Sequence, residues 1–236
     1  MTPQPLAESG PWQVLHLPGQ GGDLVISFAS IGHDLSRPPS PEFVRAATAG
    51  GRPALFVIDA ARSWGTAPGL AQALTAALAR LAPPRRILGL GVSMGAFAAL
   101  WAAEMIPLTS VLAIGPQHCP AAPDEARWRD LTAALPPDLT APLPLAPQIT
   151  LLHGMVDDAA QALAFPQRKG VDHLLFPALT HSALAAHLKA QGLMAGLVDA
   201  GLAQDRRRLL RLLAQAGGQR RKAASHRTET ISSKKS

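Results

Sequence analysis

The sequence predicts an α/β fold built on a doubly wound, mostly parallel sheet. Short apolar runs alternate along the chain with segments whose apolar residues repeat at helical spacing. The apolar runs are nearly continuous and do not alternate with polar residues, which is typical of strands buried on both faces of a parallel sheet. With 236 residues, of which 47% are hydrophobic, the chain is long enough to enclose one sizeable core.

Six apolar runs are the predicted parallel strands, and they cover residues 23–30, 54–60, 86–92, 110–115, 148–154 and 171–177. An earlier run, 14–19, is expected to add an antiparallel strand. Helical spacing and flanking Pro and Gly residues predict helices over 41–51, 68–81, 95–105, 181–201 and 203–216. The Pro-rich segment 116–147 is expected to form a small cap or a long loop over the strand ends. We see no second domain and no large lid domain.

The chain divides into a single domain, 1–216, and a basic tail, 217–236. The tail holds six Lys and Arg residues and one Glu, so it carries +5 of the formal net charge of +6. It is poor in apolar residues and begins with two glycines, which predicts a disordered segment that is dispensable for folding. It also lacks aromatic residues that could stack on bases, so we expect no specific binding of nucleic acid.

The cysteine content and the absence of long apolar runs exclude several classes of protein. The single cysteine, Cys119, forms no intramolecular disulfide and no cysteine-based metal site. The first residues lack the pattern of a secretory signal, and no apolar run reaches the ~18 residues of a membrane span. We therefore expect a cytoplasmic protein with no membrane span, no metal and no cofactor. Nothing in the sequence predicts an oligomeric state.

One serine lies where a predicted strand becomes a predicted helix. The stretch Gly91-Val92-Ser93-Met94-Gly95 matches G-x-S-x-G, the pattern of a nucleophile elbow. In this tight turn the flanking glycines give room to neighbouring backbone, and the serine projects its hydroxyl into a cleft. Ligands of parallel α/β sheets bind beyond the carboxyl ends of the strands, and Ser93 lies at such an end. We predict that Ser93 is a nucleophile.

A serine nucleophile needs a base, and the base needs a carboxylate that orients it. His181 follows the last predicted strand after a short loop, and Asp157 and Asp158 follow the strand before it. The chain order is therefore Ser, Asp, His, which is the order of the α/β-hydrolases.

These residues resemble a compact member of the α/β-hydrolase superfamily, over roughly residues 12–200. The acid of that family commonly stands in an HG-x-x-D setting, and "HGMVD" implies that Asp157 is the acid, with Asp158 as the runner-up. The family's histidine usually follows a glycine, whereas Thr180 precedes His181 here. Two competing histidines, one inside a predicted strand and one in the middle of a predicted helix, are interpreted as structural: His173 and His187.

The resemblance also implies two backbone N–H donors for a developing oxyanion. One comes from the residue after the nucleophile, Met94, and the other from the loop after an early strand, where Ala29 is the first choice and Ser30 the next. Two residues at strand ends are candidates for binding substrate. Trp64 either lines the substrate pocket or packs in the core, and Gln117 either binds substrate or braces its loop.

The resulting hypothesis is a serine hydrolase that cleaves a small-molecule acyl substrate through an acyl-enzyme. The bond would be a carboxylic ester, a thioester or an amide. The alternative is a non-catalytic binding protein that keeps the fold. The short stretches "SWG", "GPQ" and "EARWRD" resemble α/β-hydrolase-like proteins from bacterial surface-glycan contexts, and that resemblance implies such a setting for the alternative.

Overall fold

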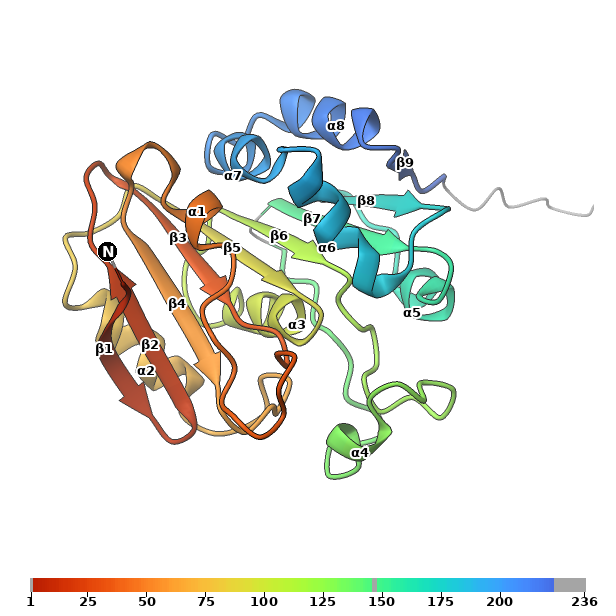
Figure 1. Ribbon diagram of the computed structural model, residues 1–236, viewed down its shortest axis with the longest axis horizontal. Coiled ribbons are helices and arrows are strands. Elements are labelled where there is room, and N and C mark those ends of the chain that lie inside the picture. Colours follow the sequence, from red (N-terminus) through yellow and green to blue (C-terminus); the bar gives the residue numbers. More distant parts are fainter. Residues whose placement is uncertain (1, 146–147, 223–236) are drawn as a thin grey trace, which may run out of the picture.

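A computed structural model describes residues 2–145 and 148–222. Across these residues nine strands form one sheet in the order β1-β2-β4-β3-β5-β6-β7-β8-β9 (Figure 1). The strands are β1 Gln4–Ser9, β2 Trp12–Leu17, β3 Asp23–Phe28, β4 Ala54–Asp59, β5 Arg86–Val92, β6 Ser110–Ile114, β7 Gln148–Gly154, β8 Val171–Phe176 and β9 Gln219–Arg220.

The centre of the sheet is parallel and its two edges are antiparallel. Strands β3 to β8 pair in parallel, whereas β1 and β2 form an antiparallel hairpin and β9 runs antiparallel to β8. The predicted mostly parallel α/β sheet is therefore confirmed, including the early antiparallel strand, which begins at Trp12 instead of residue 14. In the sheet order β3 lies between β4 and β5, and β5 is the middle strand. The Ser93 turn, which follows β5, therefore lies near the centre of the sheet.

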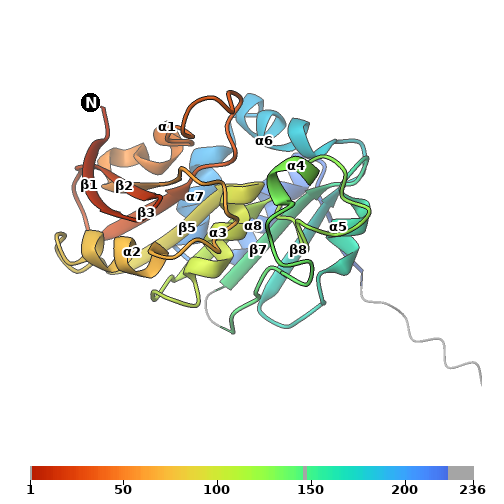
Figure 2. The same ribbon diagram turned by 90° about the horizontal axis from the view of Figure 1, so that it is seen from below.

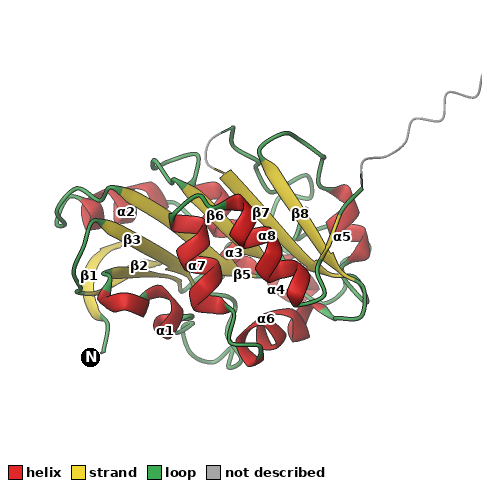
Figure 3. Cartoon of the chain, turned by 90° about the horizontal axis from the view of Figure 1, so that it is seen from above, coloured by secondary structure: helices red, strands yellow, loops and turns green. Residues whose placement is uncertain are grey.

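Helices cover both faces of the sheet (Figures 2 and 3). They are α1 Val44–Ala47, α2 Leu70–Leu78, α3 Met94–Ala102, α4 Arg129–Thr132, α5 Ala159–Ala164, α6 His181–Ala190, α7 Met194–Leu202 and α8 Arg206–Gln215. The single helix predicted over 181–201 is wrong, because Gly192 at φ +68° ends α6 and lets the chain turn into α7. Within the described ranges, no helix has the length and apolar character needed to cross a membrane.

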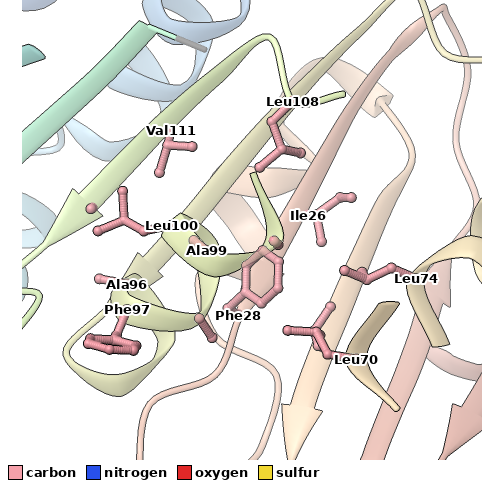
Figure 4. Close-up of a cluster of buried hydrophobic side chains, with 14 of the residues drawn as sticks. Ile26, Phe28, Leu70, Leu74, Ala96, Phe97, Ala99, Leu100, Leu108 and Val111 are labelled. Atoms are coloured by element: carbon pink, nitrogen blue, oxygen red, sulfur yellow. The ribbon is translucent and has the colours of Figure 1, made fainter. Parts of the chain in front are cut away.

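Side chains of the parallel strands alternate between two hydrophobic cores, as the period of a strand requires. On one face, Ile26, Phe28 and Val111 pack under α2 and α3, with Phe97 of α3 fully buried (Figure 4). On the other face, α1, α6, α7 and α8 contribute to the second core. It is built around Val25, Phe56, Leu90, Leu112, Leu184, Leu197 and Leu213. Strand β5 contributes Ile87 to the first core and Leu88 and Leu90 to the second. Packing on both faces therefore holds the strand that precedes the candidate nucleophile.

The chain between β6 and β7 makes the cap segment, which we define as residues 116–145. Its one helix is the single turn α4, and Figure 1 shows this segment (green) beyond the carboxyl ends of the strands. The expected small cap or long loop is therefore present, and no large lid domain occurs among the described residues.

The first residues of the predicted disordered tail are ordered in the structure. Gln219 and Arg220 form β9 against β8, and Arg221 donates hydrogen bonds to the carbonyl oxygens of Ala162 and Phe165 at 3.1 and 2.8 Å. The guanidinium thus satisfies carbonyls at the end of α5 that have no partner within the helix. Residues 217–222 belong to the domain, and the rest of the predicted tail, 223–236, lies outside the described residues.

Candidate active site

The turn between β5 and α3 has the geometry of a nucleophile elbow. Ser93 adopts φ +55° and ψ −125°, a conformation that costs energy for a residue with a side chain. A Cβ on Gly91 would lie 2.3 Å from the carbonyl carbon of Gly95, and a Cβ on Gly95 would lie 2.2 Å from the Phe28 carbonyl oxygen. Only glycine fits at both positions, so the spacing of the motif follows from the close approach of α3 to β5 and β3.

Ser93 is held at the carboxyl end of the sheet by its neighbours. Its backbone N–H donates to the Ile114 carbonyl oxygen at 2.8 Å, which ties the elbow to the end of β6. Its Oγ accepts a hydrogen bond from Gln117 Nε2 at 3.0 Å. Ser93 is 5% exposed, so the residue is buried at this end of the sheet.

A buried histidine–carboxylate pair lies beside the same turn. His181 is the first residue of α6, and its Nδ1 lies 2.7 Å from Asp158 Oδ2. His181 is 7% exposed and Asp158 is 1% exposed. A Cβ on Gly115, the residue after Ile114, would come within 3.1 Å of His181 Nδ1. A side chain at position 115 would therefore push the imidazole away from the elbow.

The carboxylate that contacts the His181 ring is Asp158, and not Asp157 as predicted. Asp157 Oδ1 accepts the backbone N–H of His181 at 2.6 Å, whereas the imidazole contacts Asp158. Asp157 is exposed, and the turn closed by the 3.3 Å bond from Asp158 N–H to the Gly154 carbonyl oxygen carries Asp158 inward. Asp157 satisfies one of the free N–H groups at the start of α6, and it does not touch the imidazole ring.

Two residues of the cap segment, which the sequence reasoning missed, contact the pair. Arg127 Nη2 lies 2.8 Å from Asp158 Oδ1, and Arg127 Nε donates to Glu125 Oε1 at 2.8 Å. The Trp128 ring lies 5.7 Å from the His181 ring, measured between centroids. Both residues stand in "EARWRD", and nothing in their spacing predicts that they reach a site formed by the far ends of β7 and β8.

The charges around Asp158 keep it ionised. Burial alone would raise the pKa of Asp158, but the hydrogen bond and charge of His181, together with the charge of Arg127, outweigh burial and lower it. Hydrogen bonding to Glu125 raises the pKa of Arg127. An ionised carboxylate only accepts hydrogen bonds, so Nδ1 carries a proton, and in the neutral form of the imidazole the lone pair is then on Nε2.

The two predicted oxyanion donors differ in whether their backbone N–H groups already have an acceptor. Met94 is the first residue of α3, where a backbone N–H has no acceptor within the helix. The Ala29 N–H donates to the Val57 carbonyl oxygen at 2.9 Å, so the sheet already uses it and the prediction for Ala29 is wrong. The runner-up, Ser30, follows directly, and its Oγ is bonded to Glu42 Oε1 at 2.5 Å.

Trp64 and Gln117 lie against each other beneath Ser93. Trp64 Nε1 donates to Gln117 Oε1 at 3.0 Å, and Gln117 Nε2 contacts Ser93 Oγ. Both side chains are fully buried. In the structure Trp64 therefore packs in the core and Gln117 braces its loop. Binding of substrate by either residue stays a prediction.

His153 and the competing histidine His173 form a separate buried cluster. His153 Nδ1 lies 2.9 Å from His173 Nε2, and His153 Nε2 lies 2.9 Å from the Pro116 carbonyl oxygen. Burial lowers the pKa of His153 to about 4, and burial with the charge of His153 lowers the pKa of His173 to about 3. His187 bonds the Ala216 carbonyl oxygen at 2.9 Å and joins α6 to the end of α8. These contacts assign all three histidines structural positions.

The site lacks one contact of a complete triad. Within residues 2–145 and 148–222, the hydrogen bond to Ser93 Oγ comes from Gln117, and none joins Ser93 to His181. Catalytic hydrogen bonds are often long in structures without substrate and tighten in the complex. Over the same residues, no group of three or more His, Cys, Asp or Glu side chains is arranged to hold a metal ion.

Solved structures share this fold at low sequence identity. A lid-less α/β serine hydrolase from Xanthomonas campestris is 15% identical, with a TM-score of 0.55, covering 86% of this chain and 94% of that chain. The capsule O-acetyltransferase of Neisseria meningitidis serogroup A is 14% identical, with a TM-score of 0.55, covering 79% and 92%. The Glycosylation Associate Protein (Gap123) complex of Streptococcus agalactiae is 14% identical, with a TM-score of 0.58, covering 87% and 46%.

No protein-family model matches the sequence, and no curated protein matches it. The solved structures that share the fold include α/β serine hydrolases and an acetyltransferase. The chain therefore has the α/β-hydrolase fold without a lid, as the resemblance of its motifs implies.

Replacing Arg127 by Met should destabilise the protein. The change leaves the buried carboxylates of Glu125 and Asp158 without their cation, and loss of one partner of a buried ion pair costs about 3 kcal/mol or more. Urea unfolding would measure the free energy of unfolding. The matched control is Arg129→Met, an exposed arginine of the same segment, which should change it by less than about 0.5 kcal/mol. Equal, small losses in both variants would contradict the role of Arg127.

Proposed function

We propose that this chain is an enzyme that forms an acyl-enzyme on Ser93 and hydrolyses a carboxylic ester, with thioesters and amides as related substrates. Ser93 is the nucleophile, His181 the general base and acid, and Asp158 the group that orients His181. The observation that carries the proposal is the buried pair of His181 and Asp158, 2.7 Å apart, at the same sheet end as a serine on a glycine-flanked elbow.

The proposed reaction follows from the tautomer that Asp158 imposes. Ser93 Oγ attacks the acyl carbonyl carbon while its proton moves to His181 Nε2. The resulting oxyanion would be met by the N–H groups of Met94 and Ser30. His181 then gives the proton to the leaving alcohol, the carbon–oxygen bond breaks, and the acyl group stays on Ser93. Water repeats the sequence and releases the carboxylic acid.

The acceptor of the acyl group defines a second candidate function. Ser93 and His181 are almost fully buried, and Trp128 of the cap segment packs beside His181. A site that excludes water favours transfer of the acyl group to a bound hydroxyl over its hydrolysis. The fold likeness to a capsule O-acetyltransferase supports a sugar hydroxyl as that acceptor. The expected location is cytoplasmic, on the support of a single cysteine.

Ser93→Ala should abolish covalent labelling by a fluorophosphonate probe, because the probe reacts with an activated serine hydroxyl. Intact-mass measurement of wild type and variant would detect one added phosphonyl group on wild type only. Ser110→Ala is the matched control, since Ser110 is a buried serine at the amino end of β6 whose Oγ donates to the Gly201 carbonyl oxygen, and it should label as wild type does. Absence of label on wild type would favour the non-catalytic binding protein, and label retained in Ser93→Ala would reject this nucleophile.

Asp158→Asn should slow labelling by ~10³-fold or more, because an amide no longer fixes the imidazole tautomer or stabilises its cation. Asp157→Asn should slow it by less than about 10-fold, since the Asn oxygen can still accept the His181 N–H. The pair is matched in chemistry and adjacent in the chain. Labelling rates measured at one probe concentration would rank them, and the reverse order would restore Asp157 as the acid.

A further inference from the structure

The nucleophile is the end of a buried chain of hydrogen bonds that the Ser-His-Asp reaction does not use. Trp64 Nε1 donates to Gln117 Oε1 at 3.0 Å, and Gln117 Nε2 donates to Ser93 Oγ at 3.0 Å. Trp64 is 0% exposed and Gln117 is 1% exposed. The three side chains come from the loop after β4, the loop after β6 and the elbow after β5.

The tryptophan determines which end of the amide faces Ser93. An indole N–H donates a hydrogen bond and cannot accept one, so the atom of Gln117 beside it must be the oxygen. The NH2 group of Gln117 therefore faces Ser93, and Ser93 Oγ is the acceptor. Because Oγ accepts from Gln117, its own hydrogen remains available for another acceptor, and His181 Nε2 is the acceptor that the reaction needs.

The loop that carries Trp64 is held in an unfavourable conformation. Trp64 has φ +51° and Arg62 has φ +52°, and neither residue is a glycine. The buried Asp59 holds the loop by accepting the Ser63 N–H at 2.6 Å, and Arg62 Nε donates to the Ile31 carbonyl oxygen at 2.8 Å. Strained residues of this kind persist where the surrounding structure enforces them, and they cluster at reactive sites.

We propose that Gln117 is a catalytic residue whose Nε2–H group stabilises the negative charge that develops on Ser93 Oγ, and that Trp64 is a positioning residue for its amide. This inference rests on the proposed function. As the Ser93 proton leaves for His181 Nε2, charge builds on Oγ before its bond to the acyl carbon is complete. When the acyl group leaves, the same charge returns until His181 gives the proton back. A fixed donor in a dry site stabilises Oγ at both moments.

The test compares two tryptophans that each donate one buried hydrogen bond. Trp64→Phe removes the donor to Gln117, and the matched control Trp12→Phe removes the donor to the Ala67 carbonyl oxygen, also at 3.0 Å. The wild-type full chain and both variants are treated with a fluorophosphonate probe. The label on Ser93 is followed with time at several probe concentrations, which separates the maximal rate, kinact, from the binding constant of the probe, KI. Melting temperatures are measured in parallel.

Both variants should lower the melting temperature by similar amounts, and only Trp64→Phe should lower kinact, by about 10-fold or more, with KI unchanged. Gln117→Met keeps the length of the side chain and removes the donor, and it should lower kinact by about 10²-fold. This second variant decides the matter if Trp64→Phe fails to fold.

Three results would overturn the inference. If kinact of Gln117→Met equals that of wild type, Gln117 is not catalytic, and the proposed function stands. If KI rises while kinact is constant, the two residues bind the probe instead of acting on Ser93. If wild type gains no label on Ser93, the proposed function fails and the inference fails with it.

Discussion

The close approach of α3 to the sheet is the constraint on which the candidate site depends. Gly95 lies so near the Phe28 carbonyl oxygen, and Gly91 so near Gly95, that neither position admits a Cβ. This contact forces the turn between β5 and α3 to be tight, and the tight turn forces Ser93 to φ +55°. The two hydrophobic cores that press β5 from both faces supply the stability that maintains this strain.

Electrostatics links the cap segment to the same site. Asp158 is buried and needs compensation for its lost hydration, which it obtains from His181 and from Arg127. The compensation ties the segment between β6 and β7 to the turn after β7, although the two are remote in the chain. The position of the cap segment, the burial of the His–Asp pair and the ionised state of Asp158 therefore depend on one another.

Local patterns predicted the sheet, the elbow and the position of His181 at the carboxyl end of the sheet, because each depends on residues adjacent in sequence or on strand ends that a parallel sheet brings together. The HG-x-x-D setting favours Asp157, but the turn after β7 leaves Asp157 exposed and buries Asp158, which contacts His181. The Ala29 N–H is not free because it pairs with the Val57 carbonyl oxygen of the neighbouring strand. No sequence motif encodes how far along a strand this pairing extends. Arg127 and Arg221 act through contacts with residues remote in the chain, which sequence periodicity does not record.

A crystal structure of the protein after reaction with a fluorophosphonate would locate the nucleophile and the oxyanion donors together. We expect phosphorus bonded to Ser93 Oγ and a phosphoryl oxygen about 2.7–3.1 Å from the Met94 and Ser30 nitrogens. We also expect His181 Nε2 within hydrogen-bond distance of the phosphonate, with Nδ1 still on Asp158. Phosphorus on another residue, or a phosphoryl oxygen that meets neither backbone N–H group, would contradict this expectation.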